Sequence, residues 1–275
     1  MREVVISPRS NRLAEHLNPV TLVRRLWQQR NLIGQFVARD VQGRYRGSVL
    51  GLFWSFLSPL MLLAVYTFVF GVVFKARWFP SRPGNLGDFA LVLFCGLVPF
   101  NLFSECINRA STLVVGVPNY VRKVVFPLEV LPVSVVGSAL FHALVSLSAL
   151  LLASLLIRGT IPLTLPLLPL IALPLVLLAL GVTWFLASLG VFVRDVQYVI
   201  ALGLQILLFL TPIFYPVDVV PEGLRLFLQC NPLAAVVENF RRVVLWGQAP
   251  EWPALASWSL ACGVVSLLGY GWFMK

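Results

Sequence analysis

The sequence predicts an all-α membrane protein with six transmembrane helices, an N-terminal amphipathic helix and two short outer helices between the fifth and sixth spans. Composition is the first reason: 59% of the 275 residues are hydrophobic and 12% are charged, whereas soluble domains carry about 25% charged residues. Six apolar runs reach the roughly 20 residues that a helix needs to cross a bilayer. Basic residues gather beside these runs instead of forming one continuous stripe. The net charge of +10 is therefore interpreted as the signal that orients the chain in a membrane, and no nucleic-acid partner is expected.

Residues 1–48 are expected to form a cytoplasmic segment with an amphipathic helix over residues 19–40. Asn18 and Pro19 make a favourable helix start, a capping residue followed by proline. No apolar core of a cleavable signal peptide precedes them. One interpretation is a helix that only anchors the chain to the inner leaflet, and the other is a helix that also forms a docking surface for a partner. The apolar positions at helical spacing are Leu22, Val23, Leu26, Trp27, Ile33, Phe36, Val37 and Val41.

Residues 49–274 are expected to form the transmembrane domain. The fourth span is placed after several prolines that follow Gly159, because proline inside a helix breaks it. The predicted spans are residues 49–74, 89–108, 130–157, about 170–193, 196–217 and 252–274.

Two short helices, over residues 221–229 and 232–246, are predicted to dip into or lie on the outer interface. Asn231 and Pro232 repeat the cap-and-proline start. In the second helix, apolar residues from Leu233 to Val244 form one face, and Glu238, Arg241 and Arg242 form the other.

The distribution of Lys and Arg predicts that both termini are cytoplasmic. Fourteen of the 21 Lys and Arg residues lie in the segments on the side of the termini, and cytoplasmic loops carry the positive excess.

Several kinds of chemistry have no support in the sequence. The four cysteines show no ligand spacing, so no metal is expected. His142 is the one ionisable residue near the middle of a span, and we expect it to be a hydrogen-bonded structural residue; Glu105 and Arg109 lie near a span end, so proton or sodium coupling is not expected. Phosphate-binding loops and hydrolase motifs are absent, so the chain has no predicted catalytic residue and binds no nucleotide itself.

Aromatic residues in three of the spans have two interpretations. They are either lipid-facing or interfacial residues, or the lining of a path along which sugar rings slide over apolar faces. The residues assigned to such a translocation path are Trp54, Tyr66, Phe70, Phe100, Phe209, Phe214 and Tyr215.

Several stretches together resemble one known family. The first span is entered through "RDVQGRYRGSVLGLFWSFLSPL"; further along the chain follow "LFCGLVPFNLFSECINRAS", "NYVRKVVFPLEVLPV", "VRDV" and "TPIFYP". These resemble, in the same order and over nearly the whole chain, the permeases of ABC transporters that export O-antigen, teichoic acid or capsular chains. The resemblance implies a homodimer in the bacterial inner membrane with two copies of a separate subunit that binds ATP and Mg.

The resemblance also implies roles for particular residues. Residues 19–40 correspond to the interface helix, and residues 116–127 to a segment that couples the permease to the ATPase. The coupling contacts fall on Asn119, Tyr120, Arg122 and Lys123.

Substrates of this family are polysaccharides on a polyprenyl diphosphate or another lipid. Arg44 and Arg46 stand where they would attract such a headgroup, although anchoring to membrane phosphates explains the same arginines. O-antigen is favoured over capsule by "VPNYVRKVVFPLEVLPV". A drug or lipid efflux permease and a scaffold or membrane-embedded enzyme that transports nothing are the remaining alternatives.

Overall fold

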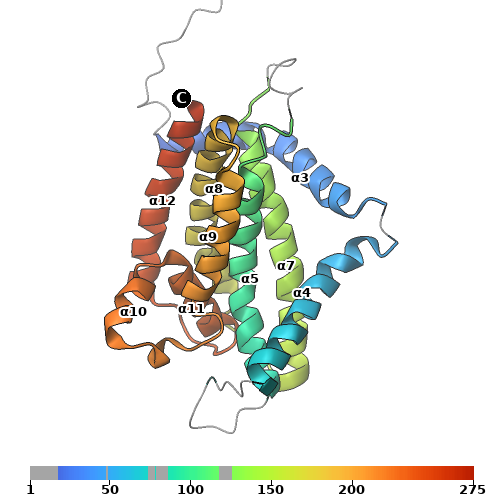
Figure 1. Ribbon diagram of the computed structural model, residues 1–275, viewed down its shortest axis with the longest axis vertical. Coiled ribbons are helices and arrows are strands. Elements are labelled where there is room, and N and C mark those ends of the chain that lie inside the picture. The colour runs from blue at the N-terminus through green and yellow to red at the C-terminus, as the bar shows by residue number, and fades with distance from the viewer. Residues whose placement is uncertain (1–17, 48, 74–77, 79–85, 118–125) are drawn as a thin grey trace, which may run out of the picture.

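The computed structural model describes residues 18–47, 49–73, 78, 86–117 and 126–275, and every regular element in these ranges is a helix (Figure 1). Within them, five helical segments are long and apolar enough to cross a membrane, which confirms the predicted all-α membrane fold. The segment Val196–Leu210, α9, is shorter, so the count of six spans stays a prediction. The five segments are Trp54–Val73 (α4 continued by η2), Leu86–Ala110 (α5), Val130–Arg158 (α7), Leu165–Phe192 (η3 continued by α8) and Trp252–Met274 (α12).

Helix α5 forms the centre of the bundle. It packs against α7, α8, α9 and the outer helix α11, and Figure 1 shows it running between α9 and α7. Its apolar side chains, such as Leu93, Cys95 and Cys106, are fully buried. In contrast, no side chain in the most apolar stretch of α4 with η2 is buried within the protomer, and in Figure 1 α4 leans away from the bundle.

The N-terminal amphipathic segment consists of two helices where one was expected. Helix α2 spans Pro19–Gln28 and α3 spans Arg30–Tyr45, with Gln29 between them. The predicted cap is present, because the Asn18 side chain accepts a hydrogen bond of 2.9 Å from the backbone N–H of Val20. Leu22 on α2 packs against Trp184 of α8 and Tyr270 of α12. The two helices therefore lie across the end of the bundle that carries the C terminus (Figure 1).

The fourth span begins two residues before the predicted position of about 170, and the fifth ends seven residues before the predicted 217; prolines lie at both places. Helix α8 spans Leu168–Phe192 and includes Pro169 in its first turn and Pro174 in its interior. Pro169 fits there because first-turn N–H groups have no partner within the helix. Helix α9 ends at Leu210 instead of residue 217. Thr211 is extended (φ −91°, ψ 133°) because Pro212 disfavours the helical conformation of the residue before it.

The outer helices α10 (Glu222–Gln229) and α11 (Pro232–Val244) lie at the opposite end of the molecule from the C terminus (Figure 1). Asn231 caps α11 as predicted, since its side chain accepts a 3.0 Å hydrogen bond from the N–H of Leu233. The assignment of Arg241 to the polar face of this helix is wrong. Its side chain is fully buried, 0% exposed, against α5 and the end of α9.

Candidate functional site

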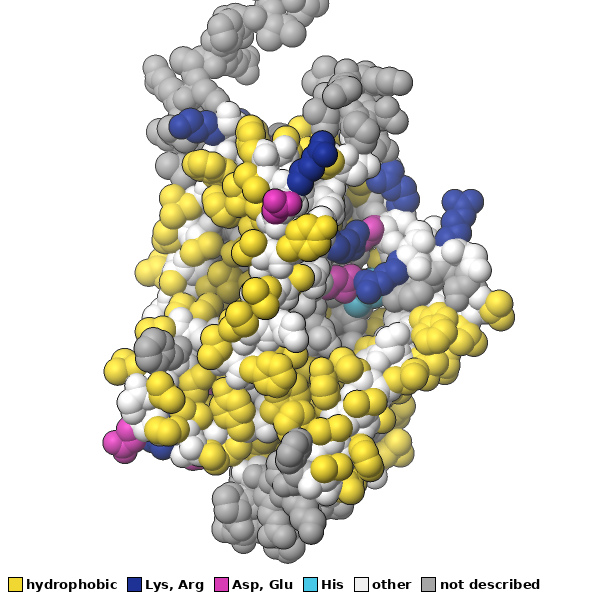
Figure 2. Space-filling view, in the orientation of Figure 1, with side chains coloured by type: hydrophobic (Ala, Val, Ile, Leu, Met, Phe, Trp, Pro, Cys, Tyr) yellow, Lys and Arg dark blue, Asp and Glu magenta, His cyan; other side chains and the backbone are white. Residues whose placement is uncertain are grey.

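A cleft of about 890 Å³ opens between α3, α4, α5 and α7. Figure 2 shows a hollow below α3 in which acidic, basic and histidine side chains lie together, above a broad apolar surface. The walls come from different parts of the chain: α3 contributes charged residues, α4 contributes Trp54 and serines, and α5 and α7 contribute the remainder. The leaning position of α4 is what leaves this space open.

At one end of the cleft, Arg109 of α5 holds α3. Its guanidinium donates two hydrogen bonds to the carboxylate of Asp40, and a third, of 3.2 Å, to the hydroxyl of Ser138 on α7. Burial raises the pKa of the Asp40 carboxyl, but the hydrogen bonds from Arg109 and Ser138 outweigh burial and hold this pKa below its usual value. Asp40 is therefore ionised at neutral pH and ties α3 to two spans.

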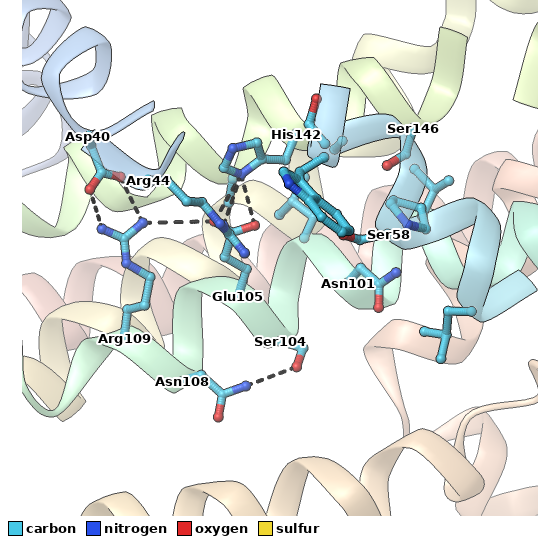
Figure 3. Close-up of a pocket in the computed structure, with 18 of the residues that line it drawn as sticks. Asp40, Arg44, Ser58, Asn101, Ser104, Glu105, Asn108, Arg109, His142 and Ser146 are labelled. Atoms are coloured by element: carbon cyan, nitrogen blue, oxygen red, sulfur yellow. Dashed lines mark hydrogen bonds and ion pairs between the residues drawn. The ribbon is translucent and has the colours of Figure 1, made fainter. Parts of the chain in front are cut away.

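Glu105 joins the same network one helical turn away (Figure 3). Its carboxylate accepts a hydrogen bond from Arg44 of α3 and lies 3.8 Å from Arg109. The Nδ1 atom of His142 is 2.9 Å and 3.1 Å from the two carboxylate oxygens, which identifies Nδ1–H as the donor to Glu105. The expectation that His142 is hydrogen-bonded is thus confirmed.

A polar stripe on α5 continues the site away from these charges. Asn101, Ser104 and Asn108 line the cleft with Glu105 and Arg109, whereas the apolar residues between them are buried. Ser58 of α4 and Ser146 of α7 face them across the cleft (Figure 3). Chemically, this arrangement offers amides and hydroxyls beside guanidinium groups, which suits a ligand with hydroxyl groups next to a phosphate.

Sequence reasoning missed this assembly, although the signal was present. Positions 101, 104, 105, 108 and 109 follow the three- and four-residue spacing of one helix face. On α7, Ser138, His142 and Ser146 are four residues apart, and on α3 so are Asp40 and Arg44. Each of these polar stripes alone indicates no site. The packing of α3, α5 and α7 brings the three stripes face to face.

A second polar centre, also missed, lies on α11, at the end of the molecule opposite the C terminus (Figure 1). Arg241 donates hydrogen bonds to three backbone carbonyls: Val92 of α5 (3.3 Å), Pro212 (2.7 Å) and Ile213 (3.0 Å). The guanidinium carbon stands 4.2 Å from the ring centre of Trp78, a cation–π contact. This side chain fastens the end of α9 to α5 and α11.

The residues assigned from the sequence do not all lie at one site. Arg44 lies in the cleft, and Arg46 is exposed at the end of α3. Trp54 also lines the cleft, apart from the other aromatic residues. Phe100 is 4% exposed and belongs to the core.

The remaining aromatic residues assigned to a path form one group. Phe214 contacts Tyr66 (5.1 Å between ring centres), Phe70 (4.7 Å) and Phe209 (5.7 Å). Tyr215 donates a 2.8 Å hydrogen bond to the carbonyl of Phe209. The group joins α4 and η2 to the C-terminal end of α9.

The predicted coupling residues Asn119, Tyr120, Arg122 and Lys123 lie outside the described residues. Phe126, directly after them, packs against Phe36 of α3 with ring centres 5.3 Å apart. Within the described part of the chain, no group of three or more His, Cys, Asp or Glu residues is arranged to hold a metal ion.

Comparison with known proteins agrees with a membrane transport component. The chain is 30% identical over 234 residues to the O-antigen export system permease protein RfbA of Myxococcus xanthus, covering 84% of this chain and 87% of the relative. It is 28% identical to the RfbA permease of Klebsiella pneumoniae over 76% of this chain and 78% of the relative. It is 26% identical to the polysialic acid transport protein KpsM of Escherichia coli over 78% of this chain and 81% of the relative. The family model for ABC-2 type transporters matches residues 31–245, so this chain belongs to the ABC-2 type transporter family.

Proposed function

We propose that this protein is the permease subunit of an ATP-driven exporter of lipid-linked polysaccharide, and that the cargo is O-antigen on a polyprenyl diphosphate. The observation that carries the proposal is the similarity to O-antigen export permeases along 84% of the chain. The cleft supports it, because guanidinium groups beside amides and hydroxyls match a sugar phosphate linkage better than an apolar drug.

Energy comes from a separate ATP-binding subunit, which binds ATP and Mg, in two copies per exporter. The sequence itself holds no phosphate-binding loop. Docking uses α2, α3 and the segment with Asn119, Tyr120, Arg122 and Lys123. The contact between Phe36 and Phe126 supports this assignment, because it links α3 to that segment.

The protein spans the bacterial inner membrane with both termini in the cytoplasm. Figure 2 supports this orientation, because basic side chains gather around α3 and the neighbouring end of the bundle and are sparse over the apolar surface below. Arg44 and Arg46 then stand at the level of the inner leaflet, where they contact the phosphate groups of the substrate lipid.

Two copies form the pathway between them, lined by α9 and α4. Only Ile200 and Leu204 of α9 are buried in the protomer, and Gln205, in the middle of this apolar helix, is exposed. A 15-residue helix is about 22 Å long, shorter than the roughly 30 Å hydrocarbon core. Both features favour contact with a second copy and an aqueous path over contact with lipid. Tyr66, Phe70, Phe209, Phe214 and Tyr215 line the outer part of that path.

Deletion of the gene in its host, followed by staining of surface polysaccharide, tests the proposal. We expect the O-antigen to disappear from the surface and to return with the wild-type gene. Purification of the tagged protein in mild detergent should yield two copies together with two copies of an ATP-binding protein. Intact surface polysaccharide combined with new drug sensitivity would instead identify a drug or lipid efflux permease, and a chain that never copurifies with an ATPase would favour the scaffold.

A capsular polysaccharide is the second candidate cargo, supported by the 26% identity to KpsM. In that case the deletion removes capsule and leaves O-antigen in place.

A further inference from the structure

We infer that the cleft between α4 and the α5–α7 pair is a glycosyl phosphate site within a single protomer, where Glu105 holds Arg44 until a phosphate group replaces the Glu105 carboxylate. The inference rests on the proposed function and deepens it, because it assigns the sugar–phosphate linkage of the cargo to residues distinct from the aromatic group at the outer end.

The first argument is the unused hydrogen-bonding capacity of the cleft. Asn101 of α5, Ser58 of α4 and Ser146 of α7 make no side-chain hydrogen bond with other described residues, and all three line the cleft (Figure 3). Unpaired polar groups within membrane-spanning helices are costly unless water or a polar ligand satisfies them. Sugar hydroxyls, which donate and accept, match this set of an amide and two hydroxyls.

The second argument is size. A cavity of about 890 Å³ falls within the roughly 300–1,000 Å³ of small-molecule sites. It therefore suits one headgroup and not a length of polymer. Trp54 on the α4 wall adds an aromatic surface for the apolar face of a sugar ring.

The third argument is the way the charges are shared. Asp40 and Glu105 balance Arg109 and Arg44, and Arg39, which also lines the cleft, adds one further positive charge. The Arg44 side chain is 51% exposed, while that of Glu105 is 16% exposed. A phosphate entering the cleft thus reaches the open side of the guanidinium, with which it pairs in a bidentate manner.

The exchange leaves no buried carboxylate without a partner. When Arg44 turns to the phosphate, Glu105 keeps the hydrogen bond from His142 and the neighbouring charge of Arg109 at 3.8 Å. Asp40 keeps both hydrogen bonds from Arg109. Glu105 is a positioning residue that competes with the ligand, so it sets the affinity for phosphate without touching the sugar.

Equilibrium binding to the full-length protein in phosphatidylcholine nanodiscs tests the site. The probes are a synthetic tetraprenyl diphosphate hexoside and the same tetraprenyl diphosphate without sugar. Arg44→Ala should weaken both probes at least about tenfold, and Glu105→Gln should tighten both about threefold to tenfold, because the neutral amide no longer competes for Arg44. Asn101→Ala should weaken the hexoside alone. Arg30→Ala, an exposed arginine of α3 outside the cleft, is the matched control and should change neither.

If a folded Glu105→Gln protein binds the probes unchanged or more weakly, Glu105 does not compete with the phosphate for Arg44. If Glu105→Gln does not fold, the test rests on Asn101→Ala, because the Asn101 side chain makes no hydrogen bond that the fold depends on. An equal effect of Asn101→Ala on both probes would show that the cleft does not bind the sugar. Displacement of the hexoside by phosphatidylglycerol at equal concentration would assign the cleft to phospholipid headgroups and overturn the inference. The proposed function fails separately, if deletion of the gene leaves the surface polysaccharide intact.

Discussion

Arg241 is a buried guanidinium whose donors are used by backbone carbonyls of α5 and of the turn after α9. Its closest acidic neighbour is Glu238, at 3.6 Å, whose own pKa is raised by burial. Gly96 on α5 makes room for it, because a Cβ there would lie 2.7 Å from Nη2. The Arg241 side chain therefore connects α11, α5 and the turn after α9.

Replacing Arg241 by methionine should lower the free energy of unfolding by about 3–5 kcal/mol, because the carbonyls and Glu238 lose a buried cationic partner. Thermal unfolding of the purified protein in detergent measures this. Arg242→Met is the matched control. Arg242 is partly exposed and bonds Ala249 and Glu251 at the surface, so its loss should cost less than about 1 kcal/mol. Equal stabilities of the two variants would contradict the role given to Arg241.

The pair of Asp40 and Arg109 makes stability depend on pH in a defined direction. Since the pKa of Asp40 in the folded protein is below its usual value, folding favours the ionised carboxylate. This contribution is complete above the ordinary carboxyl pKa of about 3.9 and is lost as the pH falls through the lower pKa of the folded state.

Asp40→Asn should therefore be less stable than the wild type by about 2 kcal/mol at neutral pH, and the difference should shrink as the pH approaches 3. Chemical unfolding across that pH range measures it. Glu222→Gln, in the exposed first turn of α10, is expected to change stability by less than about 0.5 kcal/mol. A difference between Asp40→Asn and the wild type that is constant with pH would show that the carboxylate charge is not what matters.

At the scale of helices, α8 and α12 pack with their backbones in contact. A Cβ added at Gly269 of α12 would overlap the carbonyl oxygen of Gly181 on α8, and one at Gly190 would overlap that of Ser111. Small residues at such crossings let membrane helices approach closely. On the same helix α12, Gly263 has only Leu177 nearby, at 4.0 Å.

Gly269→Ala should therefore abolish folding or reduce the yield of folded protein severalfold, because both colliding groups are backbone. Gly263→Ala should fold normally, since its Cβ would make an ordinary contact. Size-exclusion profiles of the two detergent-purified variants compare them directly. Normal folding of Gly269→Ala would mean that α8 and α12 are farther apart than in this structure.

The elements that sequence reasoning predicted well are those whose signal is local. Long apolar runs gave α5, α7 and α12 within a few residues, and the caps at Asn18 and Asn231 marked the starts of α2 and α11. The break at Gln29 was missed, because tertiary packing decides whether such a position bends or stays helical. Arg241 was assigned to the wrong face because charge normally indicates exposure, and its carbonyl partners lie more than 25 positions away along the chain.

The candidate site was predictable in parts only. Arg44 was singled out by its place at the start of the first span, but its partner Glu105 and the His142 side chain that bonds Glu105 come from two other helices. Spacing on one helix reveals a polar face, and only the packing of α3 on α5 and α7 shows which faces meet. The four coupling residues stay a prediction, since they lie outside the described residues.

At the scale of the whole molecule, the proposed dimer can be tested by asking whether α9 contacts the second copy. Helix α9 exposes most of its circumference, and a Cβ at its Gly203 would meet nothing within 4 Å in the protomer. A bulky side chain there leaves the protomer fold intact and projects outward. Leu260 on α12 is also strongly exposed, on a helix not assigned to the pathway, and provides a matched position.

Gly203→Trp should weaken the dimer at least about tenfold in Kd and abolish polysaccharide export, because the indole occupies space that the proposed partner helix fills. Leu260→Trp should leave both unchanged, since a tryptophan facing lipid displaces only acyl chains. Native mass in detergent and surface polysaccharide staining report the two effects. A dimeric, active Gly203→Trp protein would mean that α9 faces lipid and that the pathway is built on another surface, whereas a monomer that still exports would separate transport from dimerisation.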